Sequence, residues 1–547
     1  MKTAYIPGYN PITGEWNDSL TNDHQWSSVN TREAIPDVMT PYTWSIIRDS
    51  FVQMTMLPGY PPIGNICGRA YNNASVGATA FQVLGQGNAL DDTSIELYGI
   101  DPNNIGEWNL PLIPLGFWDR ALVLRNALRI MSNVRKAVKS IQTFLDTNPA
   151  WCETHRSKLP VLEKDKLVHW SNNLFVPYIT RCFWWMTGSA ITQSNLISKL
   201  RKDLLKITSP DETVALLSNV STEDEILSSL GIVASLDRLR RGRMSRGEYL
   251  EKYGHRGPHE AELSTPRPAE TPNWIDEQLD GLKHAPADVE TLLQEQRLRY
   301  KSALFNLQKA APRKYDSFLN RIQEAARLTR LREAVRSEGI RIFWVSRVFV
   351  LRVGALCGLD EDAFFLEHEE IIRLLGGQKE STEQIPIRKT AYQKFSTLPQ
   401  YPTLIMGHFD PFTWAADPNR TTDVYDPKRL LKKQLTDIIK GLPGSAGCAE
   451  GCVRVINSPE EGMLLQPGEI LVAVTTNVGW TPIFPRAAAV VTDVGAPLSH
   501  AAIVARELGI PAVVGCFNAT KLLRTGDHVR VNGARGTVEI LKQNGES

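Results

Sequence analysis

The sequence lacks a long uninterrupted hydrophobic run and an excess of charge of either sign. Its 547 residues include 61 basic and 60 acidic side chains, so the composition gives no support for a nucleic-acid-binding surface. The most apolar stretch, residues 340–358, is interrupted by Arg341, Arg347 and Arg352, which argues against a membrane span. The N-terminus has no apolar core of the kind found in signal peptides. We therefore expect neither a nucleic-acid nor a membrane partner.

Cysteines are few and widely spaced. Seven of them, an odd number, predict reduced thiols in the cytoplasm rather than a disulfide framework. Cys448 and Cys452 have the spacing of a metal-binding pair, but no second pair or nearby histidine in the sequence completes a site, so no metal centre is predicted. A Gly-rich phosphate loop followed by Lys-Ser/Thr is also missing. We expect no tightly bound cofactor in this chain.

The composition and the spacing of apolar residues change along the chain, which predicts an α+β protein of several domains. Residues 1–75 are rich in Pro, Gly, Asn and aromatic residues, which predicts irregular structure with short strands. Later, apolar residues recur at three- and four-residue spacing, which predicts helices at 121–146, 196–204, 223–230 and 289–309. The predicted domains are a mostly helical domain (1–410, including 1–75), a linker (411–440) and a small C-terminal domain (441–547).

One segment of the small domain sets a single histidine at the start of a helix. Residues 487–492 predict a buried strand, and residues 495–497 (Gly-Ala-Pro) a turn. After His500, apolar residues follow at helical spacing until Gly509, a residue suited to end a helix, and 512–514 resumes as a strand.

This position suits a histidine that carries a phosphoryl group. The first turn of a helix has unpaired N–H groups and the positive end of the dipole, both of which favour an anion. A neutral imidazole is a nucleophile there, and the same amides would stabilise phosphohistidine. Ser499 and Thr492 are candidates to bind phosphate oxygens. A helix-capping or surface histidine is the alternative that the residues alone leave open.

The segment resembles the swivelling phosphohistidine domain of the phosphoenolpyruvate-utilising enzymes. Their pattern, T-x-x-G-G-x-x-S-H-x-A-I-x-A-R-E-x-G-I-P-A-V-V-G, is matched at nearly every position from Thr492 onward. The resemblance also covers residues 441–447, 467–472, 479–484 and 526–533. It implies a β/β/α domain in which His500 is the phosphocarrier and Arg506 belongs to the phosphate site. Ala496 replaces the second glycine, and Leu498 stands where pyruvate phosphate dikinases have a regulatory threonine.

Three further polar clusters lie in the predicted helical domain. The first, residues 252–267, has glycines around His255-Arg256 and ends at Arg267, as in a tight loop that presents a cation and an acid or base. A solvated loop paired with Glu260 or Glu262 is the alternative. The other clusters are Arg332-Glu333 with Arg341 and Arg347, and residues 68–73 with Arg69.

These clusters resemble the substrate-binding region of rifampicin phosphotransferase-like enzymes, with its Y-G-H-R-G…E…S-x-P-R segment, R-E…R helix and G-R-x-Y-x-N strand. The resemblance implies a site for a small-molecule acceptor, with His255 as base and Arg256 beside it. The remaining candidates for this site are Arg267, Arg347, Arg69 and Glu260.

In multidomain relatives an ATP-grasp module precedes this region, and here the sequence starts where that module would end. The arrangement resembles the split phenylphosphate synthase. It implies a separate ATP-grasp subunit that binds Mg²⁺ and ATP and transfers the β-phosphoryl group to His500. An alternative is a prodiginine-type condensing enzyme, in which phosphorylation activates a substrate for ligation. A second is a non-catalytic phosphocarrier or scaffold.

Overall fold

The computed structural model describes residues 8–85, 110–218, 228–282, 289–418, 420–421, 423–427, 438–497 and 499–544. The chain divides into two compact units. Unit 1 comprises residues 1–188, 259–266 and 338–431, and unit 2 comprises residues 189–258, 267–337 and 432–547. Both units combine helices with a sheet, which confirms the predicted α+β class. Two long helices, α8 (Val176–Leu204) and α14 (Tyr315–Cys357), contribute residues to both units.

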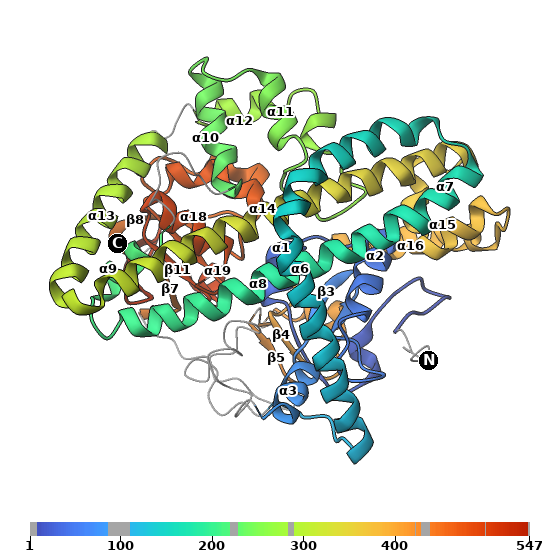
Figure 1. The fold of residues 1–547 in the computed structure, drawn as a ribbon, viewed down its shortest axis with the longest axis horizontal. Helices are drawn as coiled ribbons and strands as arrows, with labels where there is room; N and C mark the ends of the chain where they lie inside the picture. Colours follow the sequence, from blue (N-terminus) through green and yellow to red (C-terminus); the bar gives the residue numbers. More distant parts are fainter. Residues whose placement is uncertain are drawn as a thin grey trace. The chain divides into compact units, whose positions relative to one another are not determined.

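Unit 1 is a set of helices with a five-stranded sheet of order β2-β3-β1-β4-β5 (Figure 1). Its strands are β1 (Gln25–Ser27), β2 (Ile63–Ile66), β3 (Arg69–Asn73), β4 (Leu404–Met406) and β5 (Val424–Tyr425). Its own helices are α1 (Val29–Ala34), α2 (Pro41–Val52), α3 (Ala74–Val83), α6 (Phe117–Lys158), α7 (Lys164–Trp170), α15 (His368–Leu375), α16 (Ile385–Ser396) and α17 (Pro411–Ala416).

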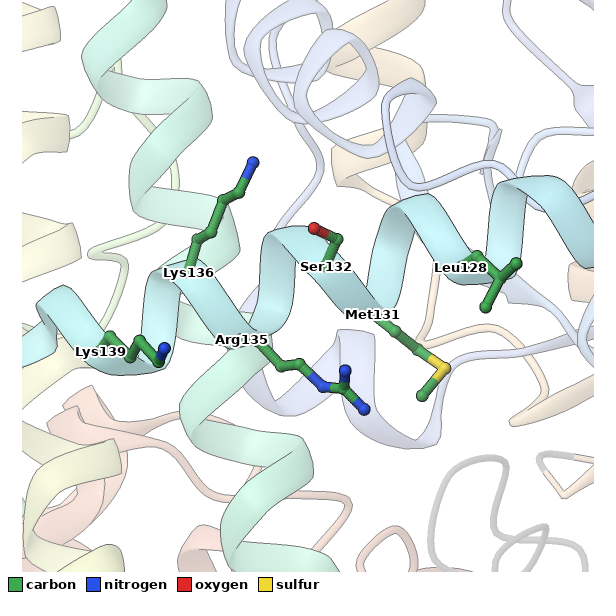
Figure 2. Close-up of a pocket in the computed structure, with 6 residues that line it drawn as sticks. All are labelled: Leu128, Met131, Ser132, Arg135, Lys136 and Lys139. Atoms are coloured by element: carbon green, nitrogen blue, oxygen red, sulfur yellow. The ribbon is translucent and has the colours of Figure 1, made fainter.

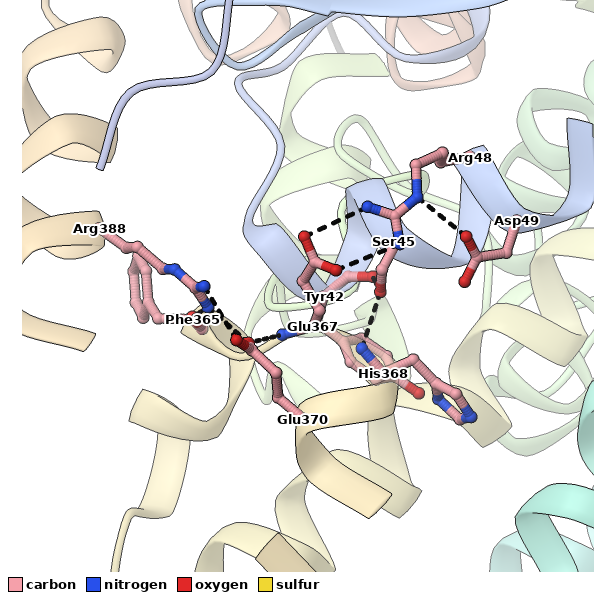
Figure 3. A network of polar contacts seen from close by, with 9 residues as sticks. All are labelled: Tyr42, Ser45, Arg48, Asp49, Phe365, Glu367, His368, Glu370 and Arg388. Carbon is pink, nitrogen blue, oxygen red and sulfur yellow. Dashed lines mark hydrogen bonds and ion pairs between the residues drawn. The ribbon is translucent and has the colours of Figure 1, made fainter. Parts of the chain in front are cut away.

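The N-terminal part of unit 1 contains more helix than its composition predicts. Helix α2 begins directly after Thr40, whose side chain accepts a hydrogen bond from Thr43 N, and Pro41 occupies its first position. Residues 42–47 of this helix are all buried. On α2, Arg48 donates a hydrogen bond to Glu367, and Ser45 accepts one from the backbone N of His368 (Figure 3). These contacts, together with the burial, stabilise a helix in a segment predicted to be irregular.

Unit 2 contains an eight-stranded mixed sheet of order β6-β13-β12-β8-β9-β10-β11-β7. Its strands are β6 (Ile438–Lys440), β7 (Leu442–Ser445), β8 (Cys448–Val455), β9 (Ile470–Ala473), β10 (Ala489–Thr492), β11 (Ala512–Val514), β12 (His528–Asn532) and β13 (Thr537–Lys542). Its helices are α9 (Pro210–Leu216), α10 (Ser228–Arg240), α11 (Arg246–Tyr253), α12 (Trp274–Leu282), α13 (Val289–Ala310), α18 (His500–Leu508) and α19 (Ala519–Leu522).

The sheet of unit 2 has a hydrophobic core on each face. One core, with Val453, Val472 and Val529, lies inside the part of unit 2 formed by residues 438–544, here called the C-terminal module. The other combines side chains of that module with side chains of the helices of residues 189–337, for example Leu200, Leu236 and Ile503. Helix α13 packs against α18 and α9 (Figure 1). The C-terminal module is therefore docked on the helical part of unit 2 in this structure.

Several local predictions agree with these elements. The predicted strands at 487–492 and 512–514 are β10 and β11, which pair in parallel. Asn532-Gly533, a hairpin signal between two valine-rich runs, marks the four-residue turn that joins β12 to β13. Of the predicted linker, 411–416 forms α17 and 424–425 pairs with β4, whereas 428–437 lie outside the described residues. Among the described helices, none combines the length and apolarity needed to cross a membrane.

Candidate functional site

His500 is the first residue of α18, as its sequence context predicts. Ser499 caps the helix, since its side chain accepts a hydrogen bond from Ala502 N. Gly509 ends the helix with φ of 68°, a left-handed conformation that glycine adopts without strain. The helix lies beside β7 and β11. Local sequence signals thus position the histidine at the carboxyl end of β10.

Two threonine hydroxyls flank the His500 ring. Thr476 Oγ1 lies 3.2 Å from Nδ1, and Thr481 Oγ1 lies 3.2 Å from Nε2. Phe484 packs edge-on against the imidazole, with ring centroids 6.0 Å apart. Only 3% of His500 is exposed. Both ring nitrogens therefore have a polar neighbour while the ring is closed off from solvent.

Burial and nearby cations keep this imidazole neutral. Desolvation is the largest cause, and the charges of Arg336 and Arg256 add to it, so the pKa of His500 lies well below its ordinary 6.5. Arg336 lies on α14, and Arg256 follows α11. A neutral ring retains a lone pair on one nitrogen, which is the form that a nucleophile requires. The positive potential that disfavours protonation would favour an anionic group on the ring.

Two predicted phosphate ligands face the turn before α18. A Cβ atom on Gly495 would lie 3.1 Å from Ser499 Oγ and 3.3 Å from Thr492 Oγ1. Thr492 is fully buried, and its hydroxyl forms no hydrogen bond with the residues that the structure describes. Such an atom costs free energy unless a ligand or water satisfies it. Leu498 in the same turn lies outside the described residues.

Arg506 on α18 hydrogen-bonds to backbone carbonyl oxygens near the start of the helix. Its guanidinium donates to Gly444 O at 3.0 Å and to Pro497 O at 2.7 Å. Burial lowers the pKa of Arg506 to about 10, with Glu507 opposing the shift and Arg201 adding to it. The contacts that the structure shows for Arg506 thus connect β7 to the turn that precedes His500.

The loop with His255 and Arg256 is attached to the turn of α14 that carries Arg336. His255 is fully buried, and its Nε2 lies 3.0 Å from Ser337 Oγ. Arg267, also buried, precedes a short 3-10 helix, and its backbone N donates to Glu270 Oε2 at 2.8 Å. These residues belong to unit 2 together with His500.

The other predicted acceptor-site residues, Arg69, Glu260 and Arg347, belong to unit 1. Arg69 donates to Pro36 O and Gln400 Oε1, and its guanidinium lies over the ring of Tyr401. Arg347 donates to Leu263 O and Ser264 O. Glu260 is buried, with 5% exposure. The structure describes these residues within unit 1 and the His500 group within unit 2.

Sequence reasoning missed Arg336, Thr476 and Thr481 as neighbours of His500. Arg336 lies four residues after Arg332, one helical turn further along α14. The helical spacing of the arginines therefore indicates that both lie on the same face of the helix. Thr481 lies within a segment that was identified by resemblance, whereas nothing in the sequence indicates Thr476. The contacts of both threonines with His500 span 19 to 24 residues of chain.

Two other features lie away from His500. His528 Nδ1 is 4.0 Å from Cys452 Sγ, a pairing across β12 and β8 that the sequence did not reveal, but the described residues contain no group of three metal-ligating side chains. In unit 1, a pocket of about 290 Å³ lies along α6 (Figure 2). Its described lining is Leu128, Met131, Ser132, Arg135, Lys136 and Lys139.

Comparison with known proteins identifies the module that carries His500. Residues 465–536 match the family described as "PEP-utilising enzyme, mobile domain". The prodigiosin synthesizing transferase PigC of Serratia marcescens is 32% identical over 309 residues, which are 54% of this chain and 33% of PigC. The rifampicin phosphotransferase of Bacillus subtilis (strain 168) is 30% identical over 345 residues, 60% of this chain and 38% of that enzyme. That of Bacillus cereus is 36% identical over 181 residues, 33% of this chain and 19% of the enzyme.

The class of domain follows from these matches: residues 465–536 match the mobile domain of PEP-utilising enzymes, and the chain is similar to enzymes that carry this domain. The matched lengths exceed that domain, so the similarity to rifampicin phosphotransferases extends into the rest of the chain. The chain spans well under half the length of these relatives.

Proposed function

We propose that this protein is a phosphotransferase component in which His500 carries a phosphoryl group to a small-molecule acceptor. The observation that carries the proposal is a buried, neutral imidazole at a helix N-terminus under the positive potential of Arg256 and Arg336. Phosphoryl transfer depends mainly on positioning and on neutralisation of charge. The site offers both.

In the first half-reaction, a ring nitrogen of His500 forms the N–P bond while the donor's bond to phosphorus breaks. Arg256 and Arg336 stabilise the added negative charge, and the threonine beside the other nitrogen holds the ring. We assign Thr492 and Ser499, whose hydroxyls lie near Gly495, as donors to the phosphate oxygens.

In the second half-reaction, the N–P bond breaks as a hydroxyl or carboxylate oxygen of the acceptor forms an O–P bond. We assign His255 as the base that takes an acceptor proton, and Arg256, Arg267 and Arg347 as the cations that accompany the phosphoryl group. Arg69 and Glu260 remain candidates for acceptor binding. As donor we propose a separate ATP-grasp subunit that holds ATP and Mg²⁺. We also propose a cytoplasmic location, since all seven cysteines are free thiols.

The experiment that tests this function is intact mass measurement after incubation of the purified chain with Mg²⁺ and ATP, with and without its ATP-grasp partner. We expect an acid-labile gain of one phosphoryl group that depends on the partner and is lost completely in His500→Asn. A gain that survives His500→Asn would contradict the assignment. A gain without any partner would contradict the proposed donor.

A second candidate function is supported by the similarity to PigC, whose name describes a synthesizing transferase. In that case the phosphorylated acceptor would react with a second nucleophile and release phosphate. Product analysis separates the two outcomes, because a stable phosphorylated acceptor supports the phosphotransferase, whereas free phosphate with a coupled product supports ligation.

A further inference from the structure

The loop that carries Thr476 also makes a close contact outside the His500 site. It runs from the end of β9 into a 3-10 helix, Val478–Arg486. Within it, Asn477 Oδ1 accepts a hydrogen bond from Gly479 N at 3.0 Å, and Asn477 Nδ2 donates to Pro258 O at 2.7 Å. Pro258 follows directly on the loop that holds His255 and Arg256. Residues 477–479 thus connect the C-terminal module to the loop that carries Arg256.

Gly479 allows the two backbones to meet. A Cβ atom at this position would lie 2.3 Å from Pro258 Cα and 2.9 Å from Pro258 N, which no side chain tolerates. The φ angle of Gly479 is outside the left-handed region, so alanine fits the 3-10 helix itself. The need for glycine arises only from the contact with Pro258.

We infer that Asn477 and Gly479, seated on Pro258, form a docking latch that holds His500 in its closed position. The latch and the two threonines that flank His500 lie within six consecutive residues, 476–481, so the contact with Pro258 and the contacts with the imidazole depend on the same loop. His500 must leave this buried position to meet a phosphoryl donor. Asn477 and Gly479 are therefore positioning residues that set the balance between closed and open states.

The inference deepens the proposed function, because the latch would favour the acceptor half-reaction and oppose phosphorylation by the donor. It can be tested without any phosphoryl transfer. Diethyl pyrocarbonate modifies accessible neutral imidazoles, and peptide mass spectrometry gives a separate rate for each histidine. His408, whose side chain is 60% exposed, is the internal reference.

Two variants open the latch by different means. Gly479→Ala introduces the clash with Pro258, whereas Asn477→Asp keeps the acceptor for Gly479 N and loses the donor to Pro258 O. Gly247→Ala on α11 is the matched control, because its methyl group would meet only Ser245 Oγ at 4.0 Å. We expect modification of His500 to be slow in the unaltered chain and at least about tenfold faster in both latch variants, as for a protected site that opens locally.

The rates of His408 and of the Gly247→Ala chain should not change. An unchanged rate at His500 in Gly479→Ala would overturn the latch, as would an equal increase at all histidines, which reports general unfolding. If His500 of the unaltered chain reacts as fast as His408, the closed state is not dominant and the inference is wrong. Failure of the proposed phosphotransferase function would instead appear only in the mass measurement with ATP.

Discussion

Two arginine pairs of unit 1 and the buried Arg506 of unit 2 differ in what their guanidinium groups contact. In unit 1, Arg388 lies 2.6 Å from Glu370 and Arg48 lies 3.1 Å from Glu367 (Figure 3). Burial opposes the charge of Arg388, but the hydrogen bonds and charge of Glu370 outweigh it and raise its pKa. In unit 2, Arg506 donates to two carbonyl oxygens, and burial lowers its pKa.

The charges near these arginines differ between the two units. In unit 1, Glu367 and Glu370 neutralise the charges of Arg48 and Arg388, and these pairs connect α2, α15 and α16. In unit 2, Arg256 and Arg336 act on an imidazole that carries no charge. The unit 1 pairs connect helices of the fold, whereas under the proposed function the unit 2 cations would complement a group that gains negative charge.

The largest effect should come from breaking a unit 1 pair. Arg388→Met leaves the partly buried Glu370 without its cation and should destabilise α15 and α16 by about 3 kcal/mol, the lower end for a broken buried pair. Hydrogen exchange of peptides from these helices measures the loss, and Arg388→Met with Glu370→Gln should recover part of it. Phosphorylation of His500 should persist in the single variant. If exchange is unchanged, the ion pair does not stabilise the fold.

A slightly smaller effect is expected from Arg336. Arg336→Gln removes positive potential from His500 and should slow its phosphorylation by roughly 100-fold, the magnitude seen when one charge-stabilising donor is lost. It should also raise the pKa of His500 toward 6.5, which NMR titration of the ring detects. Arg336→Lys should restore part of the rate, and the exposed Arg135→Gln on α6 is the control. Equal rates in Arg336→Gln and the control would refute the role of Arg336.

Acid should weaken unit 2 through His500. The folded pKa lies below 6.5, so under acidic conditions the unfolded chain binds a proton that folded His500 does not. This residue then lowers the free energy of unfolding by up to about 1.4 kcal/mol per pH unit below that value, and by nothing above it. Hydrogen exchange of α18 can be measured from about pH 7.5 to about pH 5.5, a range that spans the ordinary histidine pKa. Its pH dependence should be shallower in His500→Asn than in the unaltered chain. Identical profiles would argue against a depressed pKa.

The smallest effect is expected from the threonines. Thr476→Val removes one hydrogen bond to the ring, worth about 1 kcal/mol or roughly fivefold in rate. Because the bond is at Nδ1, the variant should also change the proportions of the two neutral tautomers, which ¹⁵N NMR of His500 resolves. Thr481→Val, at Nε2, should shift them in the opposite direction. Identical tautomer ratios in both variants would show that the hydroxyls do not orient the ring.

Local sequence patterns predicted the element that carries His500 but not its surroundings. Strand β10, helix α18 and strand β11 follow from apolar periodicity, a serine cap and Gly509, which all act within a few residues. Helix α2 was missed although Thr40-Pro41 is a helix-start signal, because the composition around it suggested loops. Arg336 and Thr476 were missed because their proximity to His500 depends on long-range packing.

By itself, the sequence determined where a histidine begins a helix after a buried strand, since short-range hydrogen bonding and side-chain periodicity control such elements. Only the tertiary structure decided that this histidine is buried and that the charges of two arginines from distant segments help to keep it neutral. It also decided that Gly479 meets Pro258, 221 positions earlier in the numbering of the chain. Burial and electrostatic potential arise from all segments that pack around a group, and no local pattern encodes them.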